Sequence, residues 1–135
     1  MLPEFLKFEI LTPFKKIYSA DVKAVRLPGL DGYFGVYPGH TPFLAALKVG
    51  EIKVEADNRT SYFSTTGGFV EVLPHSISVL AEVAEAASLI DIKRAQEARD
   101  RAKKRLEEGR MSWDVQRAKL AMLRAINRIR IASKE

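Results

Sequence analysis

The stretch VLAEVAEAASLIDIKRA, residues 79–95, decides the fold, because the character of the sequence changes within it. All six prolines and seven of the eight glycines precede it, and Trp113 is the one aromatic residue that follows it. The charge changes too: residues 1–87 carry 8 Lys/Arg against 10 Asp/Glu, whereas residues 88–135 carry 14 against 7. A shift in breakers, aromatics and charge at one place predicts two structural units that meet near residues 84–90.

Residues 1–86 are expected to form β-strands. Short runs rich in Val, Ile, Phe, Tyr and Thr recur about every ten residues, which is typical of a sandwich or barrel. Apolar and polar residues alternate within several runs, so each strand would present one face to a core and one to water. The clearest examples are residues 5–11, 22–27, 51–56 and 76–81. Turn-forming residues, among them Gly67-Gly68 and Asp57-Asn58-Arg59, separate the runs.

Residues 87–135 are expected to form two helices that pack as a hairpin. Apolar residues recur at three- and four-residue spacing on both sides of Gly109, which suits the left-handed end of the first helix. The two stripes are Ala95, Ala98, Ala102 and Leu106, and then Val115, Ala118, Met122, Ala125 and Ile129. Alanine buries little apolar area, about 0.8 kcal/mol for each methyl-sized group. The hairpin is therefore expected to dock weakly on the strands.

The composition excludes several classes of protein. With 47% hydrophobic and 29% charged residues, it is that of a soluble globular chain. The absence of cysteine excludes disulfide scaffolds, thiol nucleophiles and thiolate metal sites. The first thirty residues show neither a signal peptide nor an apolar stretch long enough to span a membrane. The chain is therefore expected to remain inside the cell.

The sequence argues against catalysis. The glycine-rich segments at residues 29–35 and 67–68 lie between strand-like runs, whereas the glycine loops that bind nucleotide phosphates open a helix. Turn formation is the favoured role for these glycines. His40 and His75 have no neighbouring nucleophile or carboxylate in a catalytic arrangement, and two histidines leave little for a metal site.

The basic hairpin carries the more informative residues. Arg94 and Arg101 are seven residues apart, and Arg124 and Arg128 are four apart, so each pair falls on one helix face. Guanidinium groups that converge between antiparallel helices would suit a polyphosphate. A solvated face with local ion pairs is one alternative. A stand-alone nucleic-acid-binding module is another, which the run Lys103-Lys104-Arg105 would support and the scarcity of aromatic residues disfavours.

Several ordered motifs resemble one protein family. The first is GYFGVYPGHTP at residues 32–42, followed by LAALKVG at 44–50. GGFVEV at 67–72, VLAE at 79–82 and IDIKRA at 90–95 come next in the same order and spacing. Together they closely resemble the epsilon subunit of bacterial F-type ATP synthases, over essentially the whole chain.

This resemblance implies a fold and a role. The expected fold is a ten-stranded, two-sheet β-sandwich followed by an antiparallel two-helix hairpin. The expected role is that of a non-catalytic, rotating subunit of the central stalk, which helps couple proton flow to ATP synthesis and requires no cofactor. The sandwich would bind the gamma subunit and the membrane rotor ring, with no nucleic-acid partner. The chain is accordingly expected at the bacterial plasma membrane, peripheral and on its cytoplasmic side.

The resemblance also implies that the hairpin is regulatory. In the family, the hairpin either folds down on the sandwich or extends along the gamma subunit into the alpha/beta catalytic head, where it inhibits ATP hydrolysis. Arg110, Arg117 and Lys119 would then meet an acidic loop of the catalytic head, because a basic hairpin is attracted to negative charge.

Contacts with the rotor ring are implied by the same comparison of motifs. The loop that holds His40 matches the part of the family's sandwich that faces the ring. Tyr33 stands where some relatives have a carboxylate, so any charge pairing of that position with the ring is altered here. The neighbouring Asp31 could supply the missing carboxylate.

Some family members bind ATP in the folded-down hairpin, and this chain matches the positions that contact the nucleotide. The matching residues are Glu85, Ile90, Asp91, Arg94, Ala95, Arg101, Arg124 and Arg128. The arginines would carry the phosphates, Asp91 and Glu85 would accept hydrogen bonds from adenine or ribose, and Ala95 would leave room for the base. ATP is therefore expected as a regulatory ligand, and capping of the first helix is the alternative role of Asp91.

Overall fold

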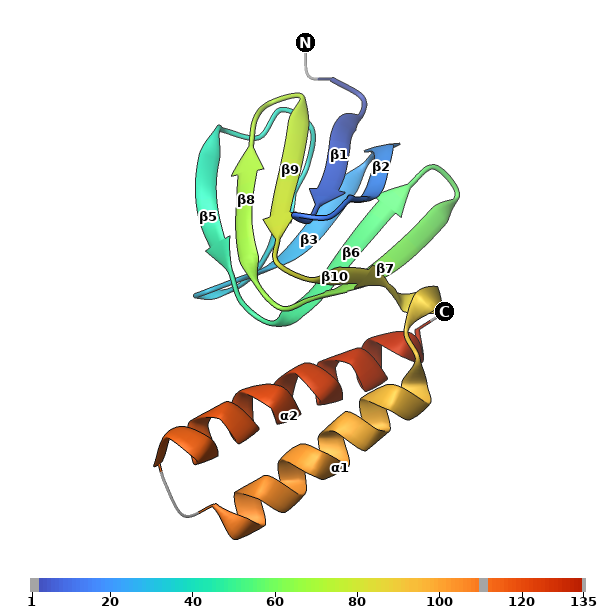
Figure 1. Ribbon diagram of the computed structural model, residues 1–135. Helices are drawn as coiled ribbons and strands as arrows, with labels where there is room; N and C mark the ends of the chain where they lie inside the picture. Colours follow the sequence, from blue (N-terminus) through green and yellow to red (C-terminus); the bar gives the residue numbers. More distant parts are fainter. Residues whose placement is uncertain (1–2, 110–111, 135) are drawn as a thin grey trace.

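The computed structural model describes residues 3–109 and 112–134. In these residues ten strands precede two helices (Figure 1). The strands are β1 (Leu6–Leu11), β2 (Lys16–Val22), β3 (Ala24–Gly29), β4 (Gly32–Val36), β5 (Phe43–Leu47), β6 (Gly50–Ala56), β7 (Arg59–Thr65), β8 (Gly68–Val72), β9 (Ser76–Ala81) and β10 (Ala84–Ala86). A short 3₁₀ turn, η1 (Ala87–Leu89), then leads to α1 (Ile92–Glu108) and α2 (Ser112–Ala132). The expected fold class, a β-sandwich followed by a helical hairpin, is confirmed.

The two expected sheets are joined by strand pairing into one continuous sheet that folds over on itself (Figure 1). Its order is β10-β7-β6-β3-β5-β8-β9-β1-β2, and β4 pairs with β3. Among the described strand pairs, only β1 and β9 run parallel. β2 also contacts β6 and β10, which brings the two ends of the order together and closes the sandwich.

The core lies inside this folded sheet. Leu6, Phe8 and Ile10 of β1 are fully buried, while the residues between them are at least partly exposed. Tyr18 of β2 packs edge-on against Phe63 of β7, with ring centroids 4.9 Å apart. The predicted alternation of buried and exposed residues is thus confirmed in β1, where it builds one wall of the core.

One predicted strand is wrong. The alternating run at residues 22–27 is divided between β2 and β3 by a bend at Lys23. Val22 pairs with β1, whereas Ala24 pairs with β6. The chain therefore changes its neighbouring strand at Lys23. Alternation could not reveal this crossing, because it reports which face of a strand is buried and not which strand lies beside it.

The two helices pack through alanines. Ala95 and Ala102 of α1, and Ala118 and Ala125 of α2, are at most 2% exposed. The members of each pair are seven residues apart, so they recur on one face of their helix. Small side chains at the contact let helix axes approach closely. The predicted alanine-lined hairpin is confirmed, and the helices lie side by side in Figure 1.

Gly109 does not have the predicted role. Its φ angle is −55°, so the first helix does not end in a left-handed residue. A Cβ atom at this position would lie only 2.7 Å from Cγ2 of Val115. Glycine is needed here because Val115 of α2 packs closely against this residue.

Ala102→Leu is expected to loosen the hairpin, because three added carbon atoms at a buried contact cost about 1–3 kcal/mol. Thermal unfolding followed by helical circular dichroism should begin at a lower temperature in this variant. The sandwich, followed by tyrosine absorbance, should unfold as before. Gln96→Leu, at an exposed position of the same helix, is the control. Equal destabilisation by the two variants would contradict the close alanine contact.

Candidate functional site

The last turns of α2 hold the hairpin on the sandwich, and we call this the docking contact. Asn127 is 3% exposed, and its Nδ2 donates to the carbonyl oxygen of Gly50 at 2.9 Å. The Lys134 ammonium lies 2.6 Å from Oε1 of Glu51, whose side chain is buried. A small apolar cluster completes the contact: Ala87, Ile90, Ile131 and Ala132, packed against Tyr62. Docking therefore involves one end of the hairpin.

A bidentate ion pair between Arg128 and Glu85 reinforces the docking contact. Nε of Arg128 donates to Oε1 of Glu85, and Nη2 of Arg128 donates to Oε2 at 3.3 Å. Both side chains are only about a quarter exposed. Two parallel hydrogen bonds fix the orientation of a guanidinium group on a carboxylate. The structure thus brings together two residues that the sequence predicts to bind ATP, one from β10 and one from α2.

Three more of the predicted ATP-binding residues surround the start of α1. Oδ1 of Asp91 accepts a hydrogen bond from the backbone N–H of Arg94 at 3.0 Å, so Asp91 caps the helix. Ile90 belongs to the docking contact, and Ala95 is fully buried against α2. This part of the predicted site is held in place by helix capping and by the alanine contact.

Six arginines form two rows with the same spacing. The α1 row is Arg94, Arg101 and Arg105, and the α2 row is Arg117, Arg124 and Arg128. Steps of seven and four residues keep each row on one helix face. Arg105, Arg117 and Arg124 line a groove of about 330 Å³ together with Leu120 and Ala121. We call this the arginine groove, and it brings cationic groups of both helices together.

The groove contains one residue that sequence reasoning missed. The sequence alone favours Arg105 as part of the basic run with Lys103 and Lys104, although its spacing from Arg101 repeats that of Arg124 and Arg128. That repeated spacing was the available signal. The groove could not be identified from it, because a single helix does not show which row of its partner it faces.

Two of the three residues predicted to contact the catalytic head lie in the half of α2 that is far from the docking contact. Arg110 is outside the described residues. Arg117 and Lys119 lie exposed in the first half of α2. Arg117 also lines the arginine groove, so one side chain is shared by two predicted roles.

The residues predicted to contact the rotor ring are not gathered at one point. Asp31 precedes β4 and His40 follows it, so the length of a strand separates them. Tyr33 lies nearer Asp31 and is held in place. Its hydroxyl accepts a hydrogen bond from the backbone N–H of Glu51 at 3.0 Å, and the Arg26 guanidinium lies 4.5 Å from its ring centroid.

The outward face of β5, β8 and β9 carries three exposed apolar side chains beside the polar Glu71 and Ser78, which sequence reasoning also missed. Leu44, Phe69 and Leu80 are 70%, 56% and 54% exposed. Phe69 and Leu80 are direct cross-strand partners, so their side chains lie together. We call these three residues the apolar face. The sequence signal for this face is Phe69-Val70. Adjacent residues of a strand point to opposite faces, so two apolar neighbours place one apolar side chain on the outward face of β8.

Two kinds of feature are absent from the part of the chain that the structure describes. Within residues 3–109 and 112–134, no group of three or more His, Asp or Glu side chains could hold a metal ion. No helix in the same residues is long and apolar enough to cross a membrane. The histidines, His40 and His75, lie in different loops.

Comparison with known proteins identifies the family. Residues 5–87 match the beta-sandwich domain of the ATP synthase Delta/Epsilon chain, and residues 89–133 match its long alpha-helix domain. This chain belongs to the ATP synthase delta/epsilon family. The resemblance found in the sequence motifs is confirmed.

Curated relatives and solved structures agree with this membership. The ATP synthase epsilon chain of Syntrophobacter fumaroxidans is 43% identical over 133 residues, which cover 98% of this chain and 99% of the relative. That of Bacillus velezensis is 39% identical over 127 residues, covering 94% and 96%. A chain in the cryo-EM structure of Euglena gracilis mitochondrial ATP synthase, OSCP/F1/c-ring, has a TM-score of 0.81 at 18% identity, covering 91% of this chain and 78% of that one. At that identity the likeness shows a shared fold.

In this delta/epsilon chain the two matched domains meet at η1. Residues 87–91 link the sandwich covalently to α1. The docking contact is a noncovalent connection between the same two units. A change in the docking contact therefore changes how the hairpin is held, without altering the core of the sandwich.

Asn127→Ala is expected to weaken docking, because it leaves the buried Gly50 carbonyl without its donor, which costs about 1–3 kcal/mol. Amide hydrogen exchange in the last turns of α2 should become faster, by about tenfold or more, while exchange in β1 and β9 stays unchanged. Gln116→Ala, at an exposed position of α2, is the control. Unchanged exchange in Asn127→Ala would show that this hydrogen bond does not hold the hairpin.

Proposed function

We propose that this chain is the epsilon subunit in the central stalk of a bacterial F-type ATP synthase, and that its hairpin is a latch held down by ATP. The full-length match to ATP synthase epsilon chains, with both domains present, carries the proposal. A structure of the Tetrahymena thermophila ATP synthase central stalk and c-ring supports it, since a chain there has a TM-score of 0.60. In this role the chain performs no catalysis. It transmits rotation at the cytoplasmic side of the plasma membrane, bound peripherally through the complex.

The sandwich offers two surfaces for the rotor partners. The apolar face on β5, β8 and β9 suits a permanent protein contact, because exposed apolar side chains grouped on one face commonly mark an interface. We assign this face to the gamma subunit. The end of the sandwich that carries Asp31 and Tyr33 is assigned to the membrane rotor ring. His40, at the opposite end of β4, then contacts a different part of the stalk or of the ring.

The docked hairpin is suited to a two-state latch. Its docking contact consists of one buried amide hydrogen bond, two ion pairs and a small apolar cluster. The core of the sandwich is complete without it, since the large buried cluster ends at Ala84. Release of the hairpin leaves both units internally packed, so the two states can differ by a few kcal/mol and a ligand that prefers one can shift the balance. The extended state would place Arg117 and Lys119 against the catalytic head.

ATP would favour the docked state because its proposed contacts come from both helices and from β10. The arginine groove supplies guanidinium donors from α1 and α2 for the phosphates. Asp91, Ile90 and Glu85 lie at the end of the hairpin near the sandwich and would contact adenine and ribose. A ligand that binds only the docked form stabilises it by about 2.7 kcal/mol at a hundred times its dissociation constant. High ATP would therefore hold the hairpin down, and low ATP would release it.

Calorimetric titration tests the ATP site. The isolated full-length chain should bind ATP saturably, and Arg124→Ala/Arg128→Ala should weaken binding more than tenfold, because charge-assisted hydrogen bonds contribute about 1.5–3 kcal/mol each. Since Arg128 also pairs with Glu85, Arg124→Ala alone is measured beside it. Arg59→Ala/Arg99→Ala removes two positive charges outside the two rows and should bind ATP as the parent does. If both double variants lose ATP affinity equally, the loss results from the lower net charge of the chain and not from a site at Arg124 and Arg128.

Regulation of hydrolysis tests the latch. An ATP synthase depleted of its epsilon subunit should be restrained more by the full chain than by a chain that ends at residue 87, because the hairpin must reach the catalytic head to inhibit. The difference should be largest at low ATP. Equal restraint by the two chains would remove the inhibitory role of the hairpin, while leaving the stalk assignment to be judged by co-purification with the gamma subunit.

A further inference from the structure

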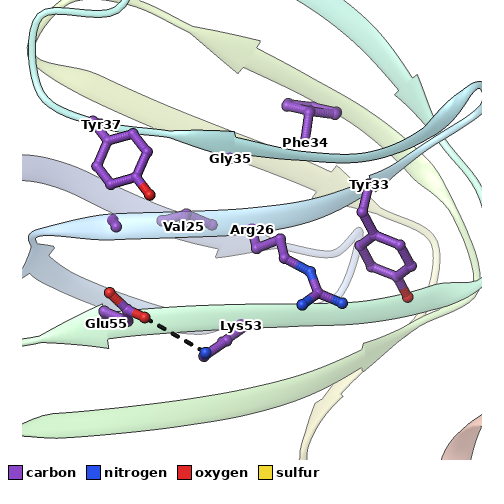
Figure 2. A pocket seen from close by; sticks show the side chains of 9 residues that line it. Val25, Arg26, Tyr33, Phe34, Gly35, Tyr37, Lys53 and Glu55 are labelled. Carbon is purple, nitrogen blue, oxygen red and sulfur yellow. Dashed lines mark ion pairs between the residues drawn. The ribbon is translucent and has the colours of Figure 1, made fainter.

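The proposed function assigns no ligand to a pocket on the outward face of β3, β4 and β6, although Tyr33, one of its walls, lies at the end assigned to the rotor ring. It measures about 320 Å³, and Arg26, Tyr33, Gly35, Tyr37, Lys53 and Glu55 are among the residues that line it (Figure 2). It contains no residue of the hairpin. Its size lies at the lower end of the range of small-molecule sites.

The strand register explains how the pocket is built. Arg26 is the direct cross-strand partner of Gly35 on β4 and of Lys53 on β6, so the three residues form one row across three strands. Figure 2 shows the two cationic side chains on this row, with the rings of Tyr33 and Tyr37 on either side of Gly35. The pocket therefore has a floor at Gly35, two aromatic walls and two cations.

Gly35 is not required by the fold. A Cβ atom at Gly50 would lie 2.6 Å from Pro28, so steric contact requires glycine there. Gly68 has a φ of 141°, a backbone angle that favours glycine. Gly35 is not among the glycines with positive φ, and a Cβ atom there would meet nothing closer than Cε2 of Tyr37, at 3.6 Å. Glycine within a strand weakens it and often marks a place where a ligand approaches the backbone. The floor of this pocket is such a place.

The charges of the lining favour an anion. Arg26 and Lys53 outnumber Glu55, and their present pairs are loose: Arg26 lies 3.8 Å from Glu51, and Lys53 lies 3.5 Å from Glu55. The Lys53–Glu55 pair is partly exposed and contributes about 0–1 kcal/mol, so Lys53 is available to an incoming group. The carboxylate of Glu51 is buried, but the Arg26 side chain itself is about half exposed, so a ligand in the pocket can reach it. Tyr37 is 65% exposed, which leaves its ring open to stacking by a planar ligand.

We propose that this pocket binds a phosphate monoester carried by a planar ring, of which a nucleoside monophosphate is the simplest example. The phosphoryl group lies between Arg26 and Lys53, where charge-assisted hydrogen bonds are strongest. The ring lies over Gly35 against Tyr37, and Glu55 accepts a hydrogen bond from a hydroxyl or amino group of the ligand. The inference does not depend on the ATP latch, since it uses no residue of the arginine groove or of the docking contact.

Residue-resolved chemical shifts of the full chain, titrated with AMP, test the proposal. The amides of Gly35, Tyr37 and Lys53 should shift saturably, and inorganic phosphate should produce the same pattern with at least tenfold weaker affinity. Gly35→Leu should abolish these shifts, because its side chain fills the floor while both cations remain. This variant is expected to fold, since leucine replaces a strand glycine where the Cβ atom has space.

A pair of lysine variants separates specific binding from net charge. Lys53→Gln should weaken AMP binding about tenfold, whereas Lys23→Gln, which breaks an exposed pair with Asp57 outside the pocket, should leave it unchanged. Absence of saturable shifts at Gly35, or shifts that persist in Gly35→Leu, would overturn the proposal. Equal affinity for AMP and phosphate would overturn the assignment of a ring-bearing ligand. Shifts confined to the hairpin would show that AMP binds in the arginine groove, and this result would also overturn the proposal for the pocket.

Discussion

The contact between the end of α2 and the sandwich is the interaction on which the behaviour of the molecule depends. It joins two units that are otherwise connected by a short covalent link, and it rests on Asn127, Lys134 and the bidentate pair of Arg128 with Glu85. The Asn127 amide and the Glu51 carboxylate are buried, whereas Arg128 and Glu85 are about a quarter exposed, so the contact combines buried and partly exposed polar groups. In the proposed latch, the hairpin leaves the sandwich as a unit when this contact breaks, since each unit has its own buried core.

The alanine contact between the helices complements this arrangement. Ala95, Ala102, Ala118 and Ala125 let the helices approach closely. Because these small side chains are covered by the partner helix, the hairpin retains its internal packing when it leaves the sandwich. The apolar residues Leu120 and Leu123 are about half exposed while the hairpin is docked. The proposed latch requires a hairpin of this kind, which is packed internally and held at one end.

Different surfaces of the chain carry different chemistry. The apolar face of β5, β8 and β9 suits a lasting protein contact, the arginine groove suits a polyphosphate, and the row of Gly35, Arg26 and Lys53 suits a smaller anion. Glu51 lies between two of these regions: its backbone binds the Tyr33 hydroxyl and its carboxylate receives Lys134 of the docking contact. Tyr33 and the docked hairpin are thus held by the same residue of β6.

The sequence by itself determined the two units, the alternation of β1 and the alanine stripes, because a strand or helix that packs on one side must repeat its apolar residues with its own period. It also determined the family, through motifs that recur in order. Only the tertiary structure decided that the run at residues 22–27 crosses between strands, that Gly109 serves close packing, and that Arg105 joins Arg117 and Arg124 in one groove. The physical reason is that periodicity describes one element at a time. Which elements become neighbours depends on long-range packing that joins residues far apart in the chain, such as Asn127 and Gly50.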